Sequence, residues 1–117
     1  MISRCSFQNK FSLEERQKES QRVRTKYNNK IPVIIEANDE SIAQIDKTKF
    51  LVPSDMTMGQ LAYVVRKRIQ ITSSEALFLM INDQLYPTGS ILSNIYNTEK
   101  SEDGFLYVVY CQENTFG

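Results

Sequence analysis

Two stretches of the chain have the apolar spacing of a helix. The first runs from residue 12 to about residue 26 and opens with Ser12 and Glu15, which have the spacing of a capping box. Its apolar stripe is thin and its polar face is broad. The second covers residues 57–69, where apolar residues recur every three or four positions. A shorter helix or turn is expected at residues 90–95.

Four other stretches are rich in β-branched and aromatic residues and predict strands: residues 31–36, 48–53, 76–81 and 105–110. The last of them is apolar at every position, so both of its faces should be covered. One helix can cover one face, and we expect segment 1–30 to cover the other. Two strands, a crossing helix and two more strands predict an α+β fold with a β-grasp sheet.

Charge is balanced overall but uneven along the chain. Fourteen Lys and Arg match fourteen Asp and Glu, which argues against a uniformly basic nucleic-acid binder. Residues 1–30 hold eight Lys or Arg against three Glu, whereas residues 31–117 hold six against eleven. The basic segment could dock on the body, on an acidic partner or on a membrane surface, and we weight the body first.

Candidate catalytic chemistry is scarce. The chain has no His, and Cys5 and Cys111 are too far apart in sequence to suggest a metal site, so we expect two reduced thiols. No phosphate-binding glycine loop or nucleophile motif is present, and no apolar run has the length of a membrane span. We therefore expect no enzymatic activity, no metal and no cofactor.

The strand at residues 48–53 is a candidate binding surface. Alternation places Lys49 and Leu51 on one face and Phe50 and Val52 on the other. Both faces of such a strand are hard to bury in a small domain, so we expect an exposed apolar patch rimmed by cations, to which Phe50 contributes. For isolated apolar residues such as Val52, a place in the core is the alternative.

The end of the chain is a candidate reactive group. A short polar segment follows the last strand and ends in Gly117, whose carboxylate has little steric hindrance. Such a carboxylate could be adenylated, passed to a thiol as a thioester and then passed to an amine. A terminal glycine alone is a weak signal, but it gains weight after a β-grasp pattern.

Eight blocks of sequence carry a resemblance to a known family: Lys30-Ile-Pro-Val-Ile34, Ile45-Asp-Lys47, Lys49-Phe-Leu-Val-Pro53, Gly59-Gln60, Tyr63-Val-Val-Arg-Lys-Arg-Ile69, Asn82-Asp83, Asp103-Gly-Phe-Leu-Tyr107 and Glu113-Asn-Thr-Phe-Gly117. In this order they resemble the autophagy-related protein 8 family, the GABARAP-like ubiquitin-like modifiers. The resemblance implies a ubiquitin-like β-grasp with two additional N-terminal helices. We expect one structural domain with three parts: an N-terminal helical segment packed on the core (1–28), the ubiquitin-like core (29–111) and a flexible conjugation tail (112–117).

The resemblance also implies that Gly117 is joined to phosphatidylethanolamine on autophagosomal membranes. Activating and conjugating enzymes would carry out this reaction, and a cysteine protease would process or deconjugate the chain. Thr115 and Phe116 would guide the tail into these enzymes. The protein would then be cytoplasmic, or bound to autophagosomal and vacuolar or lysosomal membranes when lipidated.

Cargo receptors of this family carry a motif of an aromatic residue, two variable residues and Leu, Ile or Val, with acidic neighbours. The resemblance implies that the motif adds a strand beside residues 48–53. Its aromatic side chain would enter a pocket formed by Glu19, Val23, Pro32, Ile34, Lys49, Leu51 and Phe105. Its aliphatic side chain would enter a pocket formed by Phe50, Val52, Pro53, Met56, Leu61, Val64, Val65 and Arg68. Lys47, Lys49 and Arg68 would attract the acidic neighbours.

Departures from the family pattern affect the second pocket. Leu61 stands where an aromatic residue is common and Met56 where Leu is common, which predicts a wider or more pliable pocket. Two alternative functions stay open. One is a non-conjugated adaptor of the same fold, and the other is a basic-arm protein that binds tubulin or membranes in vesicle trafficking.

Overall fold

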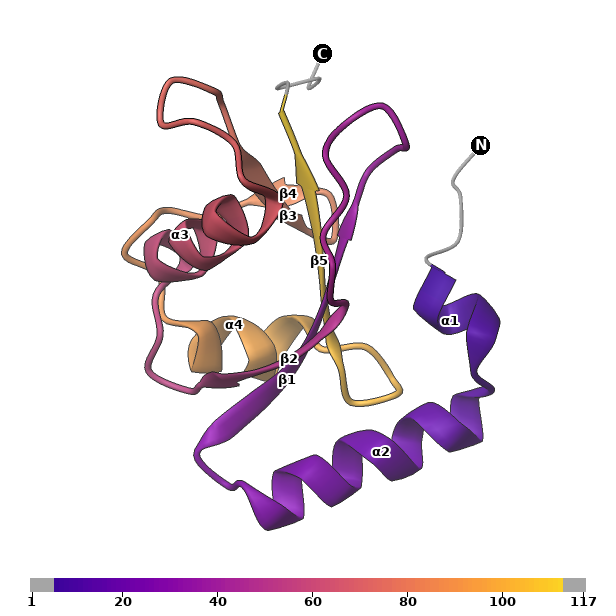
Figure 1. Ribbon diagram of the computed structural model, residues 1–117. Coiled ribbons are helices and arrows are strands. Elements are labelled where there is room, and N and C mark those ends of the chain that lie inside the picture. Colours follow the sequence, from indigo (N-terminus) through magenta and orange to yellow (C-terminus); the bar gives the residue numbers. More distant parts are fainter. Residues whose placement is uncertain (1–5, 113–117) are drawn as a thin grey trace.

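The computed structural model describes residues 6–112. Within this range the chain forms four helices and five strands (Figure 1). They are α1 (Ser6–Lys10), α2 (Leu13–Lys26), β1 (Lys30–Ala37), β2 (Lys49–Pro53), α3 (Met58–Ile69), β3 (Phe78–Ile81), β4 (Gln84–Leu85), α4 (Leu92–Glu99) and β5 (Leu106–Cys111). None of the described helices combines the length and the apolar character that crossing a membrane requires.

The five strands form one mixed sheet in the order β2-β1-β5-β3-β4. At its centre, β5 runs parallel to β1 and antiparallel to β3, while β2 and β4 form the two edges. Helices α3 and α4 lie on one face of the sheet, and α1 and α2 lie on the other (Figure 1). The predicted α+β fold, with a helix packed across a β-grasp sheet and helices added at the N-terminus, is confirmed.

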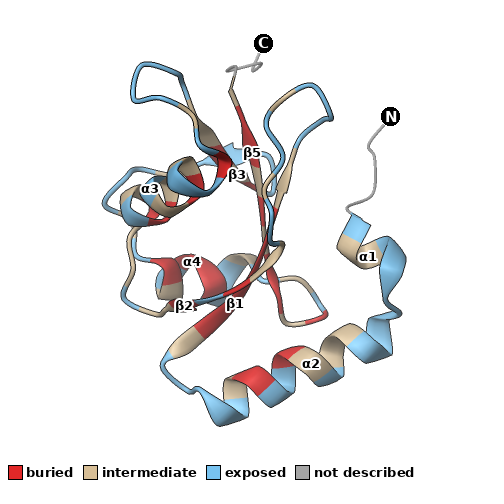
Figure 2. Cartoon of the chain, viewed as in Figure 1, coloured by how far each residue is buried: buried red, intermediate tan, exposed pale blue. Residues whose placement is uncertain are grey.

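The main hydrophobic core lies between the sheet and the pair α3 and α4. Figure 2 shows buried residues along the central strands and on the sides of the helices that face them. Alternate residues of β1, β2, β3 and β5 enter this core, as the period of a strand requires. Its buried strand residues are Ile31, Val33, Ile35, Phe50, Val52, Leu79, Ile81, Leu106, Val108 and Tyr110.

A smaller apolar layer lies on the opposite face, beneath α2. Val23 and Ile34 are each 1% exposed, and Phe105, which precedes β5, is fully buried. Further along β5, Tyr107 and Val109 are only half-buried. The expectation that both faces of this strand are covered is therefore correct at its start and only partly correct beyond it, because α2 crosses the sheet near the start of β5 (Figure 1).

Both long helices begin at capping boxes. The Ser12 hydroxyl accepts a hydrogen bond from the Glu15 amide at 3.1 Å, and the Glu15 carboxylate accepts one from the Ser12 amide at 2.8 Å. Thr57 and Gln60 exchange the same pair of bonds at the start of α3. The predicted helix starts are confirmed, since each box satisfies amides that a helix leaves without partners.

Two short elements differ from expectation. Helix α4 spans Leu92–Glu99, so it is longer than the helix or turn expected at residues 90–95. The strand β4 was not expected and follows a tight turn in which Asn82 and Asp83 have φ of 51° and 63°. Such a turn favours a hairpin, but a strand of two residues carries too little pattern to be predicted.

A buried carboxylate fixes α2 to the body. Asp103 is 1% exposed and accepts hydrogen bonds from the Arg16 guanidinium, at 2.6 Å, and from the Tyr107 hydroxyl. The Ser20 hydroxyl donates to the carbonyl oxygen of Asp103 at 2.5 Å. A buried charge without partners is costly, so these bonds hold the helix in one place. Through these bonds α2, within the basic N-terminal segment, packs on the body of the fold.

Gly104 allows this close approach of α2, and its replacement is expected to destabilise the fold. Its φ is 88°, and a Cβ at this position would lie 2.3 Å from the Ser20 hydroxyl oxygen. We predict that Gly104→Ala lowers the free energy of unfolding by about 1–3 kcal/mol, measured by denaturant titration. Gly89 has nothing within 4 Å of such an atom, so Gly89→Ala is the matched control. Equal stability of the two variants would contradict the close approach.

Candidate functional site

The outer edge of β2 carries the candidate site. Among the described residues, this strand pairs with β1 on one side only. The Ile35 amide donates to the Thr48 carbonyl, so by antiparallel alternation Phe50 and Val52 also bond to β1. The backbone groups of Lys49 and Leu51 consequently point away from the sheet. An edge of this kind can accept a further strand.

The residues of the predicted aromatic pocket lie together on the α2 face of this edge. Pro32 pairs with Leu51, and Ile34 pairs with Lys49, so the four side chains share one face. Pro32 and Ile34 are buried, as are Val23 and Phe105, whereas Leu51 is 36% exposed. The buried residues can form the floor of a pocket, and Leu51 offers the accessible apolar surface.

Charged groups border this pocket. The Glu19 carboxylate accepts hydrogen bonds from Arg22 at 2.9 Å and from the Lys49 ammonium at 2.5 Å. These bonds, first the one from Arg22 and then the one from Lys49, lower the pKa of Glu19 to about 2. Glu19 and Lys49 thus form an ion pair between α2 and β2 at neutral pH.

The predicted aliphatic pocket is divided between the core and the surface. Phe50 and Val52 are 6% and 4% exposed and belong to the main core, as do Leu61 and Val65. The expectation that Phe50 contributes to an exposed patch is therefore wrong, because alternation turns Phe50 toward α3 and leaves Leu51 as the exposed residue of this strand.

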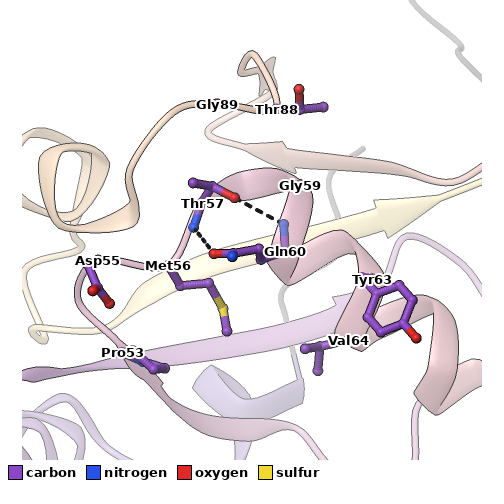
Figure 3. A pocket seen from close by; sticks show the side chains of 10 residues that line it. All are labelled: Pro53, Asp55, Met56, Thr57, Gly59, Gln60, Tyr63, Val64, Thr88 and Gly89. Carbon is purple, nitrogen blue, oxygen red and sulfur yellow. Dashed lines mark hydrogen bonds between the residues drawn. The ribbon is translucent and has the colours of Figure 1, made fainter.

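The accessible members of this group lie beside a hollow. Pro53, Met56 and Val64 line a cavity of about 740 Å³ between the end of β2, the first turns of α3 and the loop before α4 (Figure 3). Gln60 and Tyr63 also line it, and Tyr63 is 61% exposed. Sequence reasoning did not select these two. The sequence feature that could have indicated them is their position on α3 next to its apolar stripe.

Two of the three predicted rim cations, Lys47 and Arg68, lie over the Phe50 ring, whereas Lys49 pairs with Glu19 on the other face of the strand. The Lys47 ammonium is 5.2 Å and the Arg68 guanidinium carbon 5.4 Å from the centre of the Phe50 ring. Arg68 also pairs with Asp46 at 3.2 Å, but both side chains are exposed and such a pair contributes little. Attraction to the ring thus holds two positive charges beside Phe50, a residue of the predicted aliphatic pocket.

A second cavity borders the aromatic pocket on its N-terminal side. It has a volume of about 300 Å³ and is lined by Phe7, Phe11, Glu15, Arg16, Glu19 and Lys49. Sequence reasoning selected Glu19 and Lys49 and missed the other four. Phe7 and Phe11 are four residues apart, which is the spacing of one helical face and the signal that could have found them.

The predicted tail residues Thr115, Phe116 and Gly117 lie outside the described residues, and so does Cys5. The last described residue is Gln112, whose side-chain amide donates to Glu75 at 3.3 Å. Cys111 is buried, with its sulfur 3.7 Å from that of Met80.

Comparison with known proteins identifies close relatives. A family model described as "Autophagy protein Atg8 ubiquitin like" matches residues 15–117. "Autophagy-related protein 8" of Schizosaccharomyces pombe is 55% identical over 115 residues, which cover 97% of this chain and 95% of that protein. "Autophagy-related protein 8A" of Oryza sativa subsp. indica is 50% identical over 117 residues, or 99% and 98% of the two chains. The crystal structure of Trypanosoma brucei ATG8 has a TM-score of 0.89 at 39% identity and covers 98% of this chain and 100% of that one.

The Glu19 ion pair predicts a pH-dependent contribution to stability. The pKa of Glu19 falls from its ordinary 4.5 to about 2 on folding, so its contribution is present above pH 4.5 and is lost as the pH falls toward 2. We predict that Glu19→Gln is less stable than the wild type at pH 6 and that the difference shrinks by pH 2.5, measured by denaturant titration. Glu14→Gln, on the exposed side of α2, is the control. A difference that does not change with pH would contradict the lowered pKa.

Proposed function

The chain belongs to the autophagy-related protein 8 family, and from this membership we propose that it is a lipid-conjugated modifier that docks cargo receptors. Gly117 is the residue joined to phosphatidylethanolamine, and the edge of β2 is the receptor site. The protein is a substrate of enzymes in this scheme and has no catalytic role of its own. It is cytoplasmic before conjugation and bound to autophagosomal and vacuolar or lysosomal membranes afterwards.

Conjugation begins with adenylation of the Gly117 carboxylate, and three substitutions at its carbonyl follow. The carboxylate attacks ATP to form an acyl adenylate and releases pyrophosphate. A cysteine thiolate of the activating enzyme displaces AMP, and the thioester passes to the conjugating enzyme. The amine of phosphatidylethanolamine then displaces the thiol and forms an amide. The family's cysteine protease hydrolyses this amide and so releases the chain from the lipid. Support comes from the family membership and from the block that ends in Thr115-Phe116-Gly117.

Receptor docking rests on one observation, which is that no strand of residues 6–112 pairs with the outer side of β2. A peptide strand added there would bond to the backbone of Lys49 and Leu51. Its aromatic side chain would lie on the Leu51 face, and its aliphatic side chain would lie near Pro53, Met56 and Val64. Lys47, Lys49 and Arg68 supply the positive charge that attracts acidic neighbours and accelerates encounter.

A second candidate function rests on the outward side of α2. Lys18, Arg22 and Lys26 recur there at intervals of four residues and line a shallow hollow. This stripe favours binding to an acidic surface, such as tubulin or an anionic membrane, as an additional or alternative role. Such binding would weaken with added salt, so attachment that is insensitive to salt excludes it.

Single substitutions at the β2 edge test the docking site. We predict that Leu51→Ala weakens binding of an acidic aromatic-x-x-Leu peptide by about 1–3 kcal/mol, because Leu51 supplies the accessible apolar surface. Lys49→Ala should also weaken it, mainly through slower association. Isothermal titration and stopped-flow mixing measure the two effects. Leu85→Ala, at the opposite edge of the sheet, is the control because Leu85 is also exposed. If neither Leu51→Ala nor Lys49→Ala changed the affinity for the peptide, the assignment of the docking site to β2 would be wrong.

Reconstituted conjugation tests the role of Gly117. We predict that Gly117→Ala loses the lipidated product when it is incubated with the activating and conjugating enzymes, ATP and phosphatidylethanolamine vesicles. A mobility shift on gel electrophoresis measures the product, and peptide binding by the same variant shows that it is folded. A lipidated variant would refute the assignment, and a wild-type chain that gives no product would favour the non-conjugated adaptor.

A further inference from the structure

One carboxylate of β1 holds the start of α1. The Glu36 side chain accepts hydrogen bonds from the Ser6 amide at 3.1 Å, the Ser6 hydroxyl at 2.6 Å and the Phe7 amide at 3.3 Å. Strand alternation places Glu36 on the same face as Pro32 and Ile34, which is the face of the aromatic pocket. These bonds join residues 29 or 30 positions apart and fix where α1 lies on the sheet.

This attachment brings a cluster of aromatic rings to the pocket. The Phe7 ring lies edge-on to Phe105, with centres 5.2 Å apart, and is 5.1 Å from Phe11. Phe105 is fully buried and is a predicted member of the aromatic pocket, whereas Phe7 is half-buried and Phe11 is 39% exposed. The cluster therefore extends from the pocket floor to the surface.

The cavity beside this cluster is continuous with the predicted pocket, because Glu19 and Lys49 belong to both. Its charged side chains already have partners within the chain. Glu15 binds the Ser12 amide, Arg16 binds Asp103, and Glu19 binds Lys49. What remains available to an incoming group is the apolar surface of Phe7 and Phe11. A flat aromatic ring suits such a surface, and a free ion does not.

We infer that α1 forms the outer wall of the aromatic pocket. Phe7 and Phe11 contact the aromatic side chain of the receptor motif, and Glu36 is the positioning residue that holds them there. The inference rests on the proposed receptor docking and adds to it a selectivity for aromatic rings over aliphatic side chains at this position. An aromatic pair contributes beyond its buried area, so we expect an effect of roughly threefold to tenfold in affinity.

A double-mutant cycle tests the contact. Two acidic peptides are titrated into the full chain, one with Trp and one with Leu at the aromatic position. We expect Phe7→Ala to weaken the Trp peptide by about threefold to tenfold and the Leu peptide by clearly less. Phe7→Leu, which keeps apolar volume without a ring, should show the same selective loss. Equal effects on both peptides, no effect, or tighter binding of the Trp peptide would overturn the inference.

Variants of Glu36 test its positioning role. Glu36→Ala should reproduce the selective loss of the Trp peptide, because α1 loses all three hydrogen bonds. Glu36→Gln keeps a side-chain oxygen as acceptor and should restore most of the selectivity. Glu14→Ala, an exposed carboxylate on α2 paired only loosely with Lys18 at 3.7 Å, is the control. Wild-type selectivity in Glu36→Ala would overturn the positioning role.

Leu51→Ala separates this inference from the docking proposal. If Leu51→Ala weakens both peptides and Phe7→Ala changes neither, docking stands and the α1 wall is wrong. If the wild-type chain binds neither peptide, both proposals fail together. Thermal unfolding of each variant shows whether it is folded. A loss of the Trp peptide in a folded Phe7→Leu chain, with the Leu peptide unaffected, supports the wall.

Discussion

The proposed receptor site depends on the position of β2 at the edge of the sheet. Because β2 pairs with β1 alone among the described residues, the backbone groups of Lys49 and Leu51 have no strand beside them. Because successive side chains of a strand point to opposite faces, this position determines which side chains of β2 are buried and which are exposed. Phe50 and Val52 enter the core and fix the register, while Leu51 and Lys49 are presented outward. A shift by one residue would exchange the two sets and remove the site.

Helices α1 and α2 pack on the sheet beside this edge, and their side chains line a cavity next to it. Asp103 binds Arg16 and its carbonyl binds Ser20, which fixes α2 over the start of β5. From α2, the Glu19 carboxylate pairs with the Lys49 ammonium of β2. The same helix that completes the fold thereby supplies one side of the proposed aromatic pocket. Because α2 serves both the fold and the proposed binding surface, destabilising α2 would also change the proposed receptor docking.

Strong local signals explain what could be predicted from the sequence. The capping boxes at Ser12 and Thr57 fix both long helices, and β-branched runs identify the strands. The alternation of Lys49 to Val52 was also read correctly. The expectation that Phe50 is exposed is wrong. Periodicity separates the two faces of a strand but does not indicate which of them packs against α3. That choice is made by tertiary packing.

The missed parts depend on contacts between distant residues. The hydrogen bonds from Ser6 and Phe7 to Glu36 join an N-terminal helix to a strand, and no local sequence pattern indicates them. The buried Asp103 looks like an ordinary turn residue in the sequence, and its role comes from Arg16 and Tyr107. Short elements such as β4 lie below the length at which an apolar pattern can be recognised.

Amide hydrogen exchange of β2 shows directly whether a bound peptide pairs with its outer side. The Lys49 and Leu51 amides face away from the sheet in the free chain, whereas those of Phe50 and Val52 are turned toward β1. With a saturating acidic aromatic-x-x-Leu peptide, exchange at Lys49 and Leu51 should slow markedly, since these amides gain a partner strand. A peptide that binds and leaves exchange at both amides unchanged would contradict docking at this edge.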